Sequence, residues 1–82
     1  MKYYTIQIAL NLNPITKSFV PVRKMRWYTP TFCDGVLWTN YEDANLERLY
    51  IQGELKHHAV RVKPIGFIKY LLMTINQEVT LM

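Results

Sequence analysis

The stretch that decides the fold is YYTIQIALNLN, residues 3–13, in which apolar and polar side chains alternate. Large apolar or aromatic side chains occupy the even positions: Tyr4, Ile6, Ile8, Leu10 and Leu12. The odd positions carry a more mixed set: Tyr3, Thr5, Gln7, Ala9 and Asn11. A period of two over this length predicts a half-buried β-strand. Asn13 followed by Pro14 disfavours a helix and predicts a turn directly after the strand.

The next apolar segment, FVPVRKMRWYT at residues 19–29, mixes aromatic rings with cations. Its alternation is imperfect and changes face, which predicts a strand with a bulge. Pro21 cannot donate a ladder hydrogen bond, so we expect an edge strand, where cations also discourage edge-to-edge association. On such a strand Trp27 would pack inward with Met25 and Phe19. The opposite, exposed side would carry Lys24, Arg26 and Tyr28.

The clearest helix signal is TNYEDANLERLYIQGELK at residues 39–56. Thr39 and Glu42 have the spacing of a capping box, and Gly53 suits the left-handed residue that ends a helix. We therefore predict a helix over residues 40–52. Its apolar stripe, expected to face the core, is formed by Leu46, Leu49 and Tyr50, with Ala44 and Ile51 flanking it. Its acidic ridge, expected to face outward, is formed by Glu42, Asp43 and Glu47.

The remaining elements are shorter. Asp34-Gly35 predicts a hairpin between strands at residues 31–33 and 36–38. HAVRVKPI at residues 58–65 predicts a strand ended by Pro64, which could pair in parallel with 36–38 through a crossover. Residues 66–77 favour a helix over a buried strand, and residues 78–82 form a last strand or a frayed tail. Together these elements predict a single α+β domain over residues 1–82, with a mainly antiparallel sheet of three to five strands and one or two helices on one face.

Charge is segregated along the 82 residues, whose formal net charge is +4. Residues 1–33 hold five cations and no acid, residues 34–54 hold five acids and one cation, and residues 55–82 hold four cations and one acid. This pattern predicts a basic face and an acidic face, unless the segments neutralise one another internally. No secretory signal and no membrane-spanning stretch is visible, and the single Cys33 allows no internal disulfide, so we expect a cytoplasmic protein.

The residues needed for catalysis are scarce. The three glycines are isolated, so no phosphate-binding loop is present. His57 and His58 would point to opposite faces of a strand, and one cysteine with two histidines does not make a structural zinc site. Asp34 beside Cys33 would raise the pKa of the thiol and discourage a reactive thiolate. We therefore expect no enzyme, no cofactor and no metal.

The sequence instead indicates a binding protein. The first hypothesis is a protein-binding regulator or inhibitor, of the kind found as phage accessory proteins, and the alternative is a nucleic-acid-binding module that uses residues 20–30. Weak homodimerisation through residues 79–81 or 67–75 is also expected. The residues proposed to contact a partner are Arg23, Lys24, Arg26, Tyr28, Glu42, Asp43 and Glu47.

Overall fold

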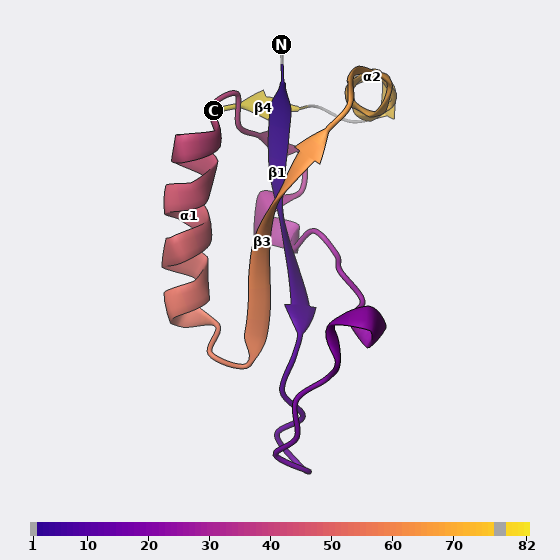
Figure 1. Cartoon of the computed structure of the whole chain (residues 1–82). Coiled ribbons are helices and arrows are strands. Elements are labelled where there is room, and N and C mark those ends of the chain that lie inside the picture. The colour runs from indigo at the N-terminus through magenta and orange to yellow at the C-terminus, as the bar shows by residue number, and fades with distance from the viewer. Residues whose placement is uncertain (1, 77–78) are drawn as a thin grey trace.

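The computed structural model describes residues 2–76 and 79–82 of the chain, and Figure 1 shows their arrangement. This part of the chain forms β1 (Tyr3–Leu10), β2 (Val36–Leu37), α1 (Tyr41–Glu54), β3 (His58–Ile65), α2 (Phe67–Asn76) and β4 (Thr80–Leu81). Two 3₁₀ turns, Val22–Lys24 and Thr31–Cys33, lie between β1 and β2. The predicted α+β fold class is confirmed, because α1 packs along an antiparallel pair of strands.

The centre of the fold is the antiparallel ribbon of β1 and β3. Its register runs from Tyr3 opposite Ile65 to Leu10 opposite His58. A second, parallel pair joins β2 to β4. The sheet is therefore narrower than expected, and the parallel crossover between residues 36–38 and β3 is wrong. β3 pairs with β1 over eight residues, whereas β2 is only two residues long and could pair with β3 over a much shorter ladder.

The second edge of β1 is bonded at isolated points. Antiparallel bridges join Leu12 to Phe19, Ile8 to Tyr28 and Tyr4 to Trp38. Residues 19–28 run opposite only residues 8–12, so most of them must loop away from the edge, and Pro21 cannot donate a bond there. The predicted strand over 19–29 is therefore wrong: the segment is bridged to Leu12, just beyond β1, at its start and to Ile8 of β1 near its end, and it forms the 3₁₀ turn Val22–Lys24 between these two points.

The predicted hairpin at Asp34-Gly35 is wrong: the chain turns there, but the residues on the two sides of the turn do not pair. Gly35 has a positive φ of 78°, which a residue without Cβ adopts readily. Thr31–Cys33 on its near side is a 3₁₀ turn and not a strand. On its far side Val36–Leu37 pairs with β4, because the C-terminal residues supply the ladder that Thr31–Cys33 does not.

Helix α1 extends beyond the predicted residues 40–52. Asn40 is the N-cap, and its side chain accepts a 2.8 Å hydrogen bond from the Glu42 backbone N–H. Thr39 instead donates through its hydroxyl to the Met82 carbonyl, over 3.1 Å. Gly53 lies inside the last turn, since the helix runs to Glu54. The prediction that Gly53 ends the helix in a left-handed conformation is therefore wrong.

The core lies between α1 and the ribbon. Its buried cluster consists of Ile6, Ile8, Cys33, Trp38, Ala44, Ile51 and Val60. The helix contributes Ala44 and Ile51, seven residues apart and therefore on one side at ~100° per residue. The predicted apolar stripe is wrong: Leu46, Leu49 and Tyr50 lie on the outer side and are exposed. The small Ala44 lets the helix lie close to the ribbon, which a search for large apolar residues does not anticipate.

The side chain of Gln52 fastens α1 to β3. Its amide nitrogen donates to the His58 carbonyl over 2.7 Å and to the Leu55 carbonyl over 3.3 Å, and its amide oxygen accepts from the Val60 N–H over 3.1 Å. The side-chain amide thus bonds the outer edge of β3 as a neighbouring strand would.

The C-terminal third of the chain ends beside β2. Residues 66–77 were expected to favour a helix, and α2 confirms it over Phe67–Asn76. The ring of Tyr70 stacks on that of Tyr3, with centroids 4.2 Å apart, which links α2 to β1. The alternatives for residues 78–82 resolve into a strand over Thr80–Leu81, while Glu78 lies outside the described residues. The predicted homodimer stays a prediction. Among the described residues, no helix combines the length and apolarity needed to cross a bilayer.

Candidate functional site

A basic hollow lies where residues 19–28 leave the edge of β1. Its lining residues are Leu10, Val20, Lys24, Arg26 and Tyr28, and its volume is about 320 Å³. Tyr28 is held in place by two backbone hydrogen bonds with Ile8, of 2.8 and 3.0 Å, while half of its side chain is exposed. The predicted grouping of Lys24 and Arg26 with Tyr28 is therefore confirmed, although a loop and not a strand produces it.

The other predicted residues of this segment divide differently. Arg23 is exposed on the 3₁₀ turn and does not line the hollow. Phe19 is 75% exposed, so its predicted inward packing is wrong. Met25 and Trp27 are half-buried.

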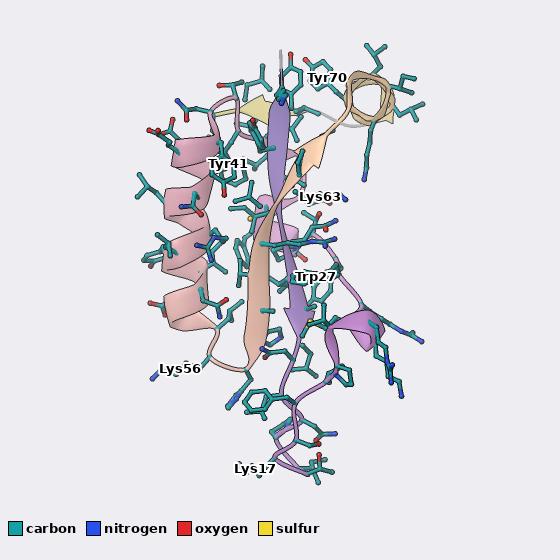
Figure 2. All side chains as sticks on the ribbon, in the orientation of Figure 1. Lys17, Trp27, Tyr41, Lys56, Lys63 and Tyr70 are labelled. Carbon is teal, nitrogen blue, oxygen red and sulfur yellow. The ribbon has the colours of Figure 1, made fainter. Side chains whose placement is uncertain are left out.

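A cation lies over the ring of Trp27. The guanidinium of Arg61 lies 4.2 Å from the centre of the ring, a cation–π arrangement. Through Nε and Nη2, Arg61 also donates to Gln7 Oε1, over 3.0 and 2.7 Å. Figure 2 shows Trp27 beside the ribbon. Sequence reasoning missed this trio because it requires the pairing of Gln7 with Arg61 across β1 and β3.

The outer side of α1 is apolar with acidic borders. Leu46, Leu49 and Tyr50 are 66%, 51% and 67% exposed. Glu42 and Asp43 are exposed in the first turn, where the positive end of the helix dipole stabilises acidic side chains. Glu47, in contrast, is half-buried and lies near Cys33, where its charge raises the pKa of the thiol. It is therefore not part of an outward-facing acidic ridge.

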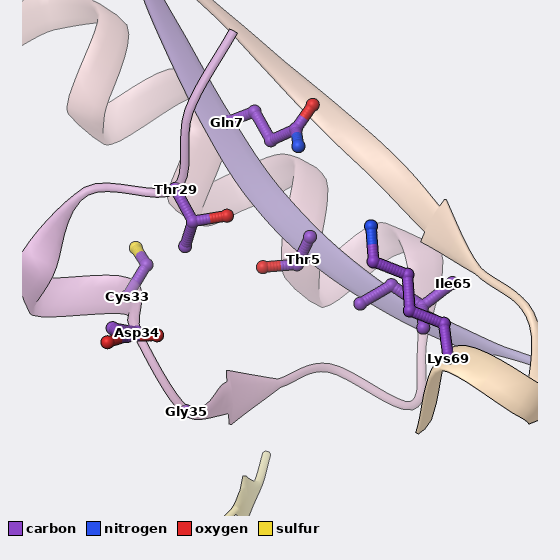
Figure 3. A pocket seen from close by; sticks show the side chains of 8 residues that line it. All are labelled: Thr5, Gln7, Thr29, Cys33, Asp34, Gly35, Ile65 and Lys69. Atoms are coloured by element: carbon purple, nitrogen blue, oxygen red, sulfur yellow. The ribbon is translucent and has the colours of Figure 1, made fainter. Parts of the chain in front are cut away.

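A separate polar pocket of about 210 Å³ lies beside β1, and Lys69 of α2 is part of its lining (Figure 3). It is lined by Thr5, Gln7, Thr29, Cys33, Asp34, Gly35, Ile65 and Lys69. Burial raises the pKa of the Cys33 thiol to about 11, and the nearby Glu47 adds to the effect. The thiol is therefore protonated at neutral pH, and the carboxylate that influences it is Glu47 rather than the predicted Asp34.

In residues 2–76 and 79–82, no group of three or more His, Cys, Asp or Glu side chains is placed to hold a metal ion. His57 is exposed, and its carbonyl accepts from the backbone N–H groups of Asn11 and Leu12 over 3.1 and 3.3 Å. The backbone carbonyl of His57 therefore links the residues that follow β1 to the turn before β3.

Comparison of the chain with known protein families, with curated proteins and with solved structures finds no match. Its function is accordingly inferred from the chemistry of these surfaces.

Proposed function

We propose that this chain is a non-enzymatic protein-binding regulator that contacts its partner through the outer side of α1. The observation that carries the proposal is the exposure of Leu46, Leu49 and Tyr50 on one side of a helix whose opposite side forms the core. Their i, i+3, i+4 spacing is that of the anchors by which a helix docks into an apolar groove. Exposed single leucines are ordinary, but three large side chains in one patch support an interaction surface.

The borders of the patch suggest the chemistry of the partner. Glu42 and Asp43 are exposed at one end of the helix and Glu54 at the other. The exposed residues of α1 include no cation, since Arg48 is half-buried and bonded to the Asn45 side chain over 2.8 Å. A complementary partner would present an apolar groove bordered by Lys and Arg, which steer association with an acidic surface. A buried free thiol also suits a reducing compartment such as the cytoplasm, which we propose as the location.

Site-specific photocrosslinking tests the proposal. A benzophenone side chain replaces Tyr50 in one variant and Lys17 in a control, because both side chains are exposed and Lys17 lies in a distant turn (Figure 2). We expect a discrete crosslinked species from position 50 in native host cells and none from position 17. Unlabelled wild-type chain should compete with that species, and a Leu46→Asp, Leu49→Asp chain should not. Equal crosslinking from both positions, or competition by the double variant, would reject α1 as the contact surface.

A second candidate function, binding of single-stranded nucleic acid, is favoured by the basic hollow. Lys24 and Arg26 can meet phosphates while the half-exposed Tyr28 ring offers a stacking surface. Trp27 supports it less, because Arg61 already occupies one face of that ring.

Salt-dependent binding of a labelled oligonucleotide tests this second function. Each phosphate of a single strand that a protein cation neutralises adds about 0.7 to the steepness with which log K falls against log salt. Lys24→Gln with Arg26→Gln should therefore reduce that steepness by about 1.4 if both side chains meet phosphates. The matched control is Lys17→Gln with Lys56→Gln, which removes two exposed cations elsewhere. An equal reduction in both double variants would mean that only net charge matters.

A further inference from the structure

We propose that the polar pocket beside β1 binds a small molecule through a carboxylate or phosphate group. The pocket holds about 210 Å³, less than the roughly 300–1,000 Å³ typical of sites for drug-sized ligands. Its lining comes from four regions of the chain: β1, the loop after Tyr28, the end of β3 and α2. The site therefore exists only when these segments are folded together, unlike a scattered set of surface cations.

The first observation is a pair of threonine hydroxyls in the lining of the pocket. Thr5 is only 5% exposed, and its hydroxyl faces that of Thr29 across the pocket (Figure 3). In the described part of the chain the Thr5 hydroxyl is not among the enclosed side-chain atoms that lack a partner, so it is open to the pocket. A hydroxyl that opens into the pocket can donate a hydrogen bond to a ligand oxygen there.

The second observation is the orientation of Gln7. Its Oε1 atom accepts both hydrogen bonds from Arg61, of 3.0 and 2.7 Å. The amide nitrogen must then turn the other way, and Figure 3 shows it on the side of Thr5. Arg61 is itself held over the ring of Trp27 at 4.2 Å. The donor that Gln7 presents to the pocket is thus oriented before any ligand arrives, which lowers the cost of binding.

The third observation is the charge at the two ends of the pocket. Lys69 reaches from α2 across Ile65 toward β1, and Asp34 lies at the opposite end, beyond Cys33 and Thr29 (Figure 3). An ammonium group together with amide and hydroxyl donors is the set that recognises an oxyanion. Asp34 would repel a second negative charge. The pocket therefore suits a molecule with one anionic group, whose other end is neutral, cationic or a hydrogen-bond donor.

Titration of the full chain with small anions, followed by the backbone amide signals in NMR, tests this proposal. The probes are inorganic phosphate and acetate, each compared with sodium chloride at the same ionic strength. We expect saturable shifts for at least one probe, centred on Thr5, Gln7, Thr29 and Gly35. A response to phosphate alone or to acetate alone identifies which oxyanion the pocket prefers.

Three variants assign the binding to this pocket. Lys69→Gln should weaken the affinity for that anion about tenfold or more, as expected when a charge-assisted hydrogen bond is removed. Gln7→Glu should do the same, because a carboxylate still accepts from Arg61 but donates nothing to the pocket. Asp34→Asn should strengthen binding by removing the repelling charge. Lys56→Gln is the matched control, because Lys56 lies at the far end of α1 (Figure 2).

Three results would overturn the proposal: no saturable shift with either anion, equal weakening by Lys69→Gln and Lys56→Gln, or unchanged affinity in Gln7→Glu. Thermal unfolding of each variant shows whether it is folded. If Lys69→Gln disturbs α2, Gln7→Glu decides the question, since it lies on β1 and keeps the acceptor that Arg61 uses.

Discussion

The two edges of β1 differ in regularity and in chemistry. Toward β3 the strand is paired along all eight residues, and α1 covers the apolar side of that ribbon. Toward the other edge it is bridged only at Tyr4 and Ile8, with a third bridge at Leu12 just beyond its end, and the chain between these points forms loops and 3₁₀ turns. The basic hollow and the polar pocket both lie along this second edge. The comparison teaches that one edge forms a continuous ladder, while the interruptions on the other leave hollows between the points where Leu37 and Trp38 still enter the core.

The sharpest test of this division compares an apolar residue from each edge. Ile6 is completely buried in the ribbon core, whereas Phe19 is 75% exposed at its bridge to Leu12. Ile6→Ala should lower the free energy of unfolding by about 2–5 kcal/mol, the range for such core truncations. Phe19→Ala should change it by no more than about 0.5 kcal/mol, as for an ordinary surface site. Chemical denaturation measures both, and similar decreases would show that the interrupted edge is equally important for stability.

Cys33 is a residue of the interrupted edge that is buried in the core. The pH dependence of stability therefore tests how well this edge keeps water away from the thiol. The folded thiol has a pKa of about 11, raised from an ordinary value of 9.0 mainly by burial. Because the unfolded thiol ionises first, the unfolded state binds fewer protons above pH 9, so stability falls as the pH rises. The contribution is fully present below pH 9 and is lost toward pH 11, at up to about 1.4 kcal/mol per pH unit.

The control for that titration is Cys33→Ala, which keeps the tyrosines and lysines that ionise in the same range. The wild-type chain should lose more stability between pH 9 and 11 than the variant does. Equal decreases would mean that residues 31–35 open readily and leave the thiol in contact with water.

The sequence predicted the regular edge better than the interrupted one, for physical reasons. Alternation over residues 3–12 reports directly on a strand with one buried side, and the acids after Asn40 report on the start of a helix. Neither signal says which side of the helix faces the strand. The large Leu46 and Leu49 suggested one side, whereas close packing through the small Ala44 selected the other.

The candidate sites were predictable only in part. Lys24, Arg26 and Tyr28 were grouped by their spacing of two, and the structure groups them by a loop that brings them to one hollow. The polar pocket could not be predicted, since it needs the register of β1 with β3 and the position of α2. Local patterns carry no information about contacts between residues as distant in sequence as Thr5 and Lys69.

Trp27 gives a smaller test, because it belongs to the interrupted edge yet contacts a residue of the ribbon. Its ring is half-buried and lies under Arg61. Trp27→Ala should cost about 1–2 kcal/mol, from part of the apolar transfer term and a cation–π interaction of about 0.5–1 kcal/mol. Trp27→Phe, which keeps a ring beneath the guanidinium, should destabilise the chain less. A decrease above about 3 kcal/mol in Trp27→Ala, measured by urea denaturation, would place the ring in the core as the sequence alone suggested.

The two glycines at 35 and 53 give the smallest effects and the finest distinction between regular and interrupted structure. Gly53 lies in the last turn of α1, and a Cβ built there meets no heavy atom within 4 Å. Because glycine is about 0.8–1.0 kcal/mol less favourable than alanine inside a helix, Gly53→Ala should stabilise the chain by about 0.5–1 kcal/mol near this helix end. Gly35 has φ of 78°, a conformation that costs a residue with a Cβ about 1–2 kcal/mol, so Gly35→Ala should destabilise the chain. The same chemical change should therefore shift the melting temperature upward at one glycine and downward at the other. A fall at position 53 would mean that the helix ends before Gly53 in solution, and the capping position assigned from the sequence would regain its support.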